Sequence, residues 1–492
     1  MTDVDLARIE SVLDVADVAG RIEGLLAIGV RPRQLSVRTL FIGILLALAD
    51  GRPAHLRRVH RALLALDDEA RRRVGVVVTW RTGEHLLTYR QVERTFALVC
   101  RALAHEHPDG TPSEALGDVL DAICEASVPQ RMKASSSLAI DWTDHEAYAR
   151  PATTTTGSKD PEAAWGHRSG GHAKGELFFG YYLSSATMVR DEGAARVAEL
   201  TRRMVLTSCR CDPVPPLVDV LCHMAGTVPL GDVLCDSGYA HRRAERFALP
   251  LRRMGARLVM DLHPHDRGTR GTHDGALCHN GNLYCPETPG PLLALSSLPR
   301  GASSAEVTAH DLKCDELSRY KLGRISRDDA DGYHRVMCPA AMGKLRCPLR
   351  EASMTLPLRL PEILEPPTLP PVCCVQATIT VPVTVNAKTA QLHDYPSKAH
   401  RVSFARRTAV ERGYSTLKDP ASTDTTRGWC RVMGLTAVSL LLACAIVVRN
   451  QRIVDAFEER QADDARRAAA GLEPRSRRRR RRGIDEMLEP AA

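Results

Sequence analysis

The stretch from Phe404 to Lys418 reads Phe-Ala-Arg-Arg-Thr-Ala-Val-Glu-Arg-Gly-Tyr-Ser-Thr-Leu-Lys. Within it, Arg407, Glu411 and Lys418 follow the spacing Arg-x3-Glu-x6-Lys. On a helix the first two are one turn apart, and Lys418 projects from the same face two turns further on. A carboxylate between two cations can hold a metal ion while the cations bind phosphates, as cleavage of a phosphodiester requires. Taken alone, the pattern also fits a solvated helix with ordinary charge pairs.

Two further carboxylates occur upstream, at the ends of predicted strands. Residues 135–142 form a short apolar segment that we expect to be a buried strand ending at Asp141, and residues 231–236 form a second one ending at Asp236. Because an acid at the carboxyl end of a parallel strand lies at the mouth of the sheet, where ligands bind, both are candidate metal ligands. The alternative for either aspartate is a turn former or a helix N-cap.

The intervening sequence alternates between strand and helix patterns. We expect one or two strands within residues 175–189, a helix near 215–224, a helix over 241–254 and a strand over 256–261. Strands that alternate with helices predict an α/β domain. Glu411 then lies on a later helix of that domain.

Together these motifs resemble the DDE transposases of bacterial insertion sequences, in particular the group with a Tyr-x2-Arg-x3-Glu-x6-Lys signature. The resemblance covers about residues 135–450 and rests on Asp141-Trp-Thr, Asp236-Ser-Gly-Tyr and the stretch from Arg406 to Lys418. It implies a ribonuclease H-like catalytic domain in which Asp141, Asp236 and Glu411 are the catalytic metal ligands. It also implies that Arg407 and Lys418 contact DNA.

One position departs from the signature, since Phe404 stands where the family has tyrosine. A phenyl ring can stack on a base or sugar, but it has no hydroxyl group to donate to phosphate. We therefore expect Phe404 to contact DNA without that hydrogen bond.

The resemblance implies two Mg²⁺ or Mn²⁺ ions about 3.5–4 Å apart, with Asp141 bridging them and the other two acids holding one each. The partners would be double-stranded DNA, namely the terminal inverted repeats of the element and its target, with a dimer joining two ends. Two alternatives remain: a ribonuclease H-like nuclease without strand transfer, and a domesticated or decayed copy that only binds DNA.

The 492 residues carry a net charge of +8, which is compatible with nucleic acid as partner but does not demonstrate it. The first residues contain neither a basic segment nor an apolar one, so we expect no signal peptide and a cytoplasmic, nucleoid-associated protein. An apolar run at 433–448 is shorter than the roughly 20 residues of a membrane span, so we expect a buried core helix and no membrane contact.

The chain divides into five predicted regions. These are an all-α DNA-binding region (1–134), the first part of the catalytic domain (135–262), a cysteine-rich and largely β insertion (263–397), the second part of the catalytic domain (398–462) and a charged, disordered tail (463–492). The N-terminal region is expected to recognise the DNA ends, or else to be a plain helical bundle. The arginine run at 477–482 is expected to bind DNA nonspecifically.

Three cysteines of the insertion, Cys285, Cys338 and Cys347, are each followed by proline, as is common at zinc knuckles. Their spacing is looser than that of well-known zinc sites, so independent buried thiols are the alternative to a structural Zn²⁺ ion. Apolar residues alternate with others over 375–385, which predicts a strand there.

Overall fold

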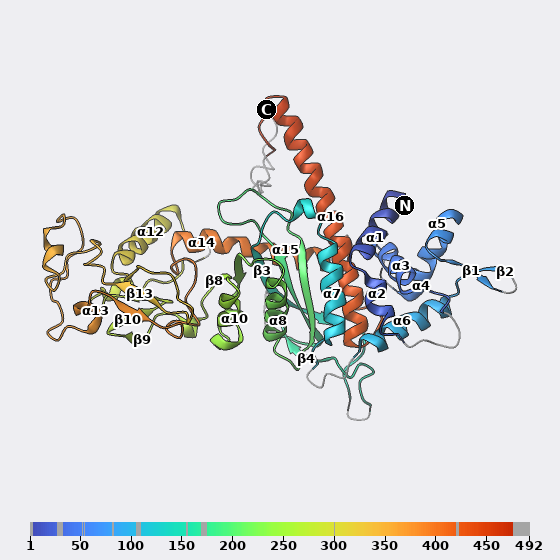
Figure 1. Cartoon of the computed structure of the whole chain (residues 1–492), viewed down its shortest axis with the longest axis horizontal. Coiled ribbons are helices and arrows are strands. Elements are labelled where there is room, and N and C mark those ends of the chain that lie inside the picture. Colours follow the sequence, from blue (N-terminus) through green and yellow to red (C-terminus); the bar gives the residue numbers. More distant parts are fainter. Residues whose placement is uncertain are drawn as a thin grey trace, which may run out of the picture.

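The structure is a computed structural model of the chain. It describes residues 3–26, 33–51, 53, 55–80, 83–104, 110–153, 156–168, 175–299, 301–419 and 423–475. Figure 1 shows an elongated molecule with a β-sheet near its middle, the N-terminal helices on one side of it and the insertion on the other. The arginine run at 477–482 lies outside the described residues.

A six-stranded mixed sheet forms the centre of the molecule. Its strands are β3 (Leu138–Glu146), β4 (Ala164–His167), β5 (Leu177–Met188), β6 (Thr201–Ser208), β7 (Asp232–Cys235) and β8 (Arg257–Met260). The order across the sheet is β4-β5-β3-β7-β8, and β6 pairs with β5 beyond the part that β4 occupies. β3 runs antiparallel to β5 but parallel to β7, which in turn runs parallel to β8. β4 and β6 lie outside the segments that the sequence predicts as strands.

β3 extends beyond Asp141, where the sequence predicted its end. All 9 residues of β3 pair with β5, whose backbone continues to supply hydrogen bonds as far as Glu146. β7, by contrast, pairs only with Leu138 and Ala139. The prediction that this strand ends at Asp141 is therefore wrong for its pairing with β5. On the β7 side the pairing does stop before Asp141, so its side chain lies at the end of the parallel part of the sheet.

Helices cover both faces of this sheet. They include α8 (Val214–Ala225), α10 (Ala248–Arg253), α15 (Thr408–Lys418) and α16 (Leu435–Ala469). Because side chains alternate along a strand, Leu138 and Ile140 join a hydrophobic cluster with α8 and α10, whereas Ala139 joins one with α15 and α16. Asp141 continues the alternation of Ala139 and so projects toward the face covered by α15, which carries Glu411.

The helix expected over 241–254 is shorter in the structure. Its regular part, α10, begins at Ala248, after the short helix α9 (Ser237–Ala240) and a 3-10 turn. Pro250 explains the difference, because proline is tolerated only in the first turn of a helix.

The N-terminal region is mostly helical but not all-α. Its helices are α1 (Asp3–Val15), α2 (Val18–Glu23), α3 (Val37–Ala49), α4 (Leu56–Leu64), α5 (Asp68–Arg73), α6 (Tyr89–Leu103) and α7 (Glu114–Ala126). A hairpin of β1 (Val77–Trp80) and β2 (Gly83–Leu86) lies between α5 and α6. The apolar residues of the region share one cluster with α15 and α16, and α16 packs against α3 and α7. Residues 1–134 therefore do not form a core separate from that of the sheet.

The insertion is mixed rather than largely β. Its main elements are β9 (Thr269–His273), β10 (Ala276–His279), β11 (Asn282–Tyr284), α12 (Ser304–Arg319), β12 (Gly323–Arg324), β13 (His334–Met337), α13 (Val372–Val375) and β14 (Ile379–Val381). The strands form two small sheets of three strands each. The strand predicted over 375–385 is reduced to β14, because Val375 belongs to α13 and Pro382 has no N–H group to continue the ladder.

α16 is a single helix of 35 residues that contains most of the apolar run at 433–448. By length and composition it is the one helix in the described part of the chain that could cross a membrane, but 83% of its most apolar window is buried inside the protein. Its burial agrees with the predicted core helix. α16 also continues to Ala469, past the boundary predicted at 462 between the catalytic domain and the tail.

Candidate active site

Three acids from separate segments lie around one arginine. Asp141 comes from β3, Asp236 caps α9 at the end of β7, and Glu411 lies in the first turn of α15. Arg407 Nη1 donates to Asp141 Oδ2 at 3.0 Å, and Arg407 Nη2 donates to Glu411 Oε1. The structure thus brings together the residues that the sequence predicted, and we call Asp141, Asp236 and Glu411 the acid cluster.

The acid cluster contains a buried carboxylate, Asp141, whose pKa is raised. Burial, helped by the charge of Asp236, raises the pKa of Asp141 to about 7, although Arg407 opposes this shift. The side chains of Asp141 and Arg407 are only 15% and 14% exposed, whereas Glu411 is half-exposed. A buried carboxylate that is difficult to ionise beside two other acids is a group that a divalent cation would stabilise.

The turn after β7 joins Asp236 to its neighbours. Asp236 Oδ1 accepts a hydrogen bond from the backbone N–H of Gly238 at 3.0 Å, so the N-cap alternative also holds for this residue. A Cβ atom on Gly238 would lie 2.5 Å from Trp142 Cη2, which explains why glycine occupies this position. Trp142 in turn packs on Tyr239 with ring centroids 4.7 Å apart. This packing fixes the end of β7 against the segment of β3 that carries Asp141.

Arg407 is positioned by the residues just before it. It belongs to a 3-10 turn, η6 (Ala405–Arg407), between α14 (Lys398–Phe404) and α15, and not to α15 itself. The turn leads directly into α15, so the predicted pairing with Glu411 one turn later still forms. The Phe404 ring lies 5.6 Å from the Arg407 guanidinium carbon and stacks on His400. Phe404 therefore supports Arg407 through a cation–π contact, while its DNA contact stays a prediction.

Lys418 lies on α15 but does not bond to Glu411. Its Nζ donates to Thr143 Oγ1 at 2.8 Å and to Asp144 Oδ1 at 3.1 Å. Asp144 also accepts from Arg168 at 3.1 Å. The described structure therefore places Lys418 in a second charged group along β3, next to the acid cluster.

Tyr414 is a positioning residue that was not predicted from the sequence. Its buried hydroxyl group donates to the carbonyl oxygen of Asp141 at 2.6 Å and accepts from Ser185 at 2.8 Å. These bonds tie α15 to β3 and β5 beside the acid cluster. A signal was present, because Val410, Tyr414 and Leu417 follow the spacing of the buried face of a helix.

Arg406, next to Arg407, has a different environment. Its Nη2 donates to Asp232 Oδ2 at 2.7 Å, and Asp232 also pairs with Arg257 at 2.6 Å. The side chain of Asp232 is 0% exposed. Arg406 thus belongs to a buried ion pair that joins η6 to β7.

The three Cys-Pro cysteines, Cys285, Cys338 and Cys347, lie in one buried cluster of the insertion. Burial and the neighbouring thiols raise the pKa of Cys285 to about 12, which favours the protonated thiol. The three sulfur atoms do not all lie within 4.8 Å of one another. The same holds for the carboxylate oxygen atoms of the acid cluster. The structural Zn²⁺ ion and the independent buried thiols both stay predictions for these cysteines.

The described residues contain one group of three potential metal ligands within 4.8 Å of one another, formed by His241, His263 and Asp266. This group has no local pattern in the sequence, because β7 and β8 bring its members together only in the folded chain. Comparison with models of known protein families and with curated protein sequences finds no match for this chain.

Proposed function

We propose that this protein is a DDE-type DNA transposase, which binds the terminal inverted repeats of its own element, cleaves the strands there and joins them to target DNA. The observation that carries the proposal is the acid cluster. Arg407 bonds two of its members, and the charge of the third contributes to the raised pKa of Asp141. A ribonuclease H-like domain is supported by the order of elements, since β3 with Asp141 precedes β7 with Asp236 and α15 with Glu411.

The chemistry of the acid cluster fits hard divalent cations. Three carboxylates supply only oxygen ligands, which Mg²⁺ and Mn²⁺ prefer. When bound, two such ions would activate the attacking oxygen and stabilise the leaving oxygen of the phosphodiester. Asp141, Asp236 and Glu411 would hold the ions, and Arg407 could then exchange its carboxylate partners for a DNA phosphate.

The DNA partner is supported by the N-terminal helices. α4 presents Arg57 and Arg61 on its exposed side, while Val59 and Leu63 are buried on the other. A basic face on a helix can hold phosphates. Joining two DNA ends would further require a dimer on DNA, in the cytoplasm next to the nucleoid.

The test is incubation of the purified full-length chain with DNA that carries the sequences flanking its gene, in Mg²⁺ or Mn²⁺. We expect nicked ends and joined products, and their loss in Asp141→Asn, Asp236→Asn and Glu411→Gln. Asp261→Asn is the matched control, because Asp261 directly follows the adjacent strand β8 but pairs with Arg267.

Other outcomes would identify the alternatives. Cleavage without joined products would indicate a nuclease that lacks strand transfer. DNA binding without cleavage would indicate a protein that has kept only its DNA contacts. Full activity in any of the three acid variants would remove that acid from the active site.

A further inference from the structure

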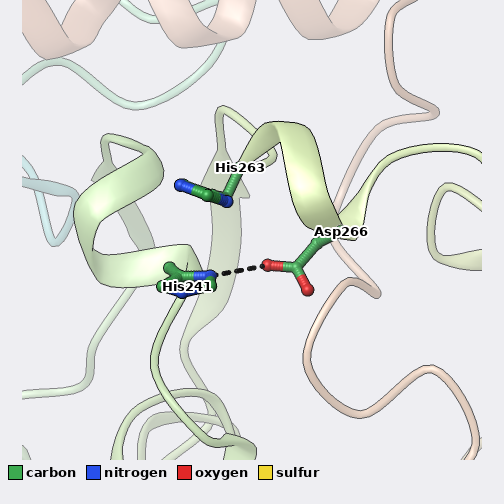
Figure 2. Close-up of side chains that lie close together, drawn as sticks. All are labelled: His241, His263 and Asp266. Carbon is green, nitrogen blue, oxygen red and sulfur yellow. Dashed lines mark hydrogen bonds and ion pairs between the residues drawn. The ribbon is translucent and has the colours of Figure 1, made fainter.

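A second group of potential metal ligands lies near the acid cluster, at the ends of β7 and β8. His241 follows α9, five positions after Asp236, and His263 and Asp266 belong to the segment that follows β8. Figure 2 shows the two imidazole rings and the carboxylate close to one another, with His241 bonded to Asp266. We call these three residues the histidine cluster.

The geometry of the histidine cluster suits one small ion. One ligand atom from each residue can be chosen so that all three lie within 4.8 Å of one another. His241 Nδ1 is 3.3 Å from Asp266 Oδ2, and the rings of His241 and His263 have centroids 4.0 Å apart. All three side chains reach solvent, so an ion could enter without opening the fold.

A cationic side chain already occupies part of this position. Lys388, from the far end of the insertion, places its Nζ 2.7 Å from Asp266. Burial would raise the pKa of Asp266, but the hydrogen bonds from Lys388 and His241 lower it below its ordinary value.

We propose that His241, His263 and Asp266 bind a transition-metal ion of the Zn²⁺ class. Imidazole nitrogen suits Zn²⁺, whereas Mg²⁺ prefers oxygen ligands throughout. Two imidazoles and one carboxylate supply three protein ligands and leave a fourth position for water. The ion would take the place of the Lys388 ammonium beside Asp266.

Such an ion would link two parts of the chain that matter for the acid cluster. His241 lies just beyond the turn that Asp236 caps, and His263 and Asp266 open the insertion. The ion would therefore connect the start of the insertion to the segment that follows β7 and begins with Asp236. The proposal does not depend on DNA cleavage, because the site and its test involve only metal binding.

The experiment is a calorimetric titration of the metal-free, full-length protein with Zn²⁺ in excess Mg²⁺, which would saturate a site made of carboxylates. We expect His263→Ala to weaken binding at this site at least about tenfold. His265→Ala is the matched control, because His265 lies in the same turn, with its ring centroid 5.0 Å from that of His263, but is not a member of the group. Lys388→Met should strengthen binding, since it removes the competing cation.

The paired variants also separate this site from any Zn²⁺ that the thiols bind, because both variants leave every cysteine unchanged. Loss of one equivalent of Zn²⁺ in His263→Ala but not in His265→Ala supports the proposal, and an Asp266→Asn variant should reproduce the loss if His263→Ala folds poorly. Equal Zn²⁺ binding by wild type, His263→Ala and Asp266→Asn would overturn it, and so would weaker binding in Lys388→Met. Asp141→Asn, which should abolish DNA cleavage, should leave this Zn²⁺ binding unchanged.

Discussion

The acid cluster and the histidine cluster lie at the ends of neighbouring strands, yet they offer different chemistry. The acid cluster has three carboxylates and the guanidinium of Arg407, whereas the histidine cluster has two imidazoles, one carboxylate and the ammonium of Lys388. Both contain a basic side chain where a metal ion could compete for the same oxygen atoms. Both groups of potential metal ligands thus lie beyond the ends of parallel strands, and their ligand atoms decide which cation each would prefer.

The largest effects on DNA cleavage and on Zn²⁺ binding should come from replacing one aspartate of each cluster with asparagine. Asp236→Asn should reduce DNA cleavage by at least about a hundredfold while leaving Zn²⁺ binding intact, because it removes a ligand only from the acid cluster. Asp266→Asn should reduce Zn²⁺ binding and leave DNA cleavage intact, because it removes a ligand only from the histidine cluster. Cleavage assays and Zn²⁺ titrations of both variants check this, and a loss of both properties in either variant would mean that the clusters act as one site.

In the absence of metal, Asp141 and Asp266 should contribute to the free energy of unfolding with opposite dependence on pH. Because the folded pKa of Asp141 is raised to about 7, its stabilising contribution is fully present below pH 4 and is lost as pH rises toward 7. Asp141→Asn should therefore stabilise the metal-free protein at pH 8, by up to about 4 kcal/mol. Urea unfolding in EDTA at pH 5 and pH 8 measures this, and an equal effect at both values would contradict it.

Asp266 is the counterpart in that experiment. Its folded pKa is lowered, so its contribution is present above the ordinary pKa of aspartate and is lost as pH falls through the folded value. Asp266→Asn should consequently destabilise the metal-free protein at pH 8. If both variants shift the unfolding midpoint in the same direction, the two carboxylates do not have opposite environments.

Smaller effects are expected at the adjacent arginines: Arg406 should matter for stability and Arg407 for cleavage. Arg406→Ala leaves the buried Asp232 without one of its partners and should cost about 3 kcal/mol of unfolding free energy. Arg407→Ala should lower cleavage at least about tenfold, since the cation of the acid cluster is lost, while the chain stays folded. Denaturation curves and cleavage rates of both variants distinguish these roles, and unfolding of Arg407→Ala would show a structural role instead.

The smallest effect is expected at Phe404. Phe404→Tyr keeps the ring against Arg407 and should change stability by less than about 0.5 kcal/mol. Cleavage should be unchanged or increased, because the hydroxyl group restores the phosphate donor of the signature. A clear loss of cleavage in a folded Phe404→Tyr protein would show that this position does not have the role of the signature tyrosine.

The acid cluster could be predicted from the sequence because each of its members has a strong local pattern. Asp141 and Asp236 follow short apolar segments, and Glu411 has a fixed spacing from Arg407. Tyr414 was not identified because its bond partner, the carbonyl group of Asp141, depends on how α15 packs on β3. The strand over 375–385 was predicted too long, because alternation alone does not show where a pairing partner ends.

The histidine cluster could not be predicted at all. His241 and His263 come together because β7 and β8 pair in parallel, and Lys388 joins them from the other end of the insertion. None of these contacts leaves a local period in the sequence. The packing of the N-terminal helices could not be predicted for the same reason, because they share a hydrophobic core with the distant helix α16.

The sequence by itself determined the local features: the apolar segments that lead to Asp141 and Asp236, the one-turn spacing of Arg407 and Glu411, and the buried apolar part of α16. These follow from the periods of side chains along a strand or a helix, which a few residues are enough to define. The tertiary structure decided which of these features meet. Only the pairing of β3 with β7 and the packing of α15 on the sheet bring the three acids to one guanidinium, since such contacts depend on burying apolar surface between distant segments.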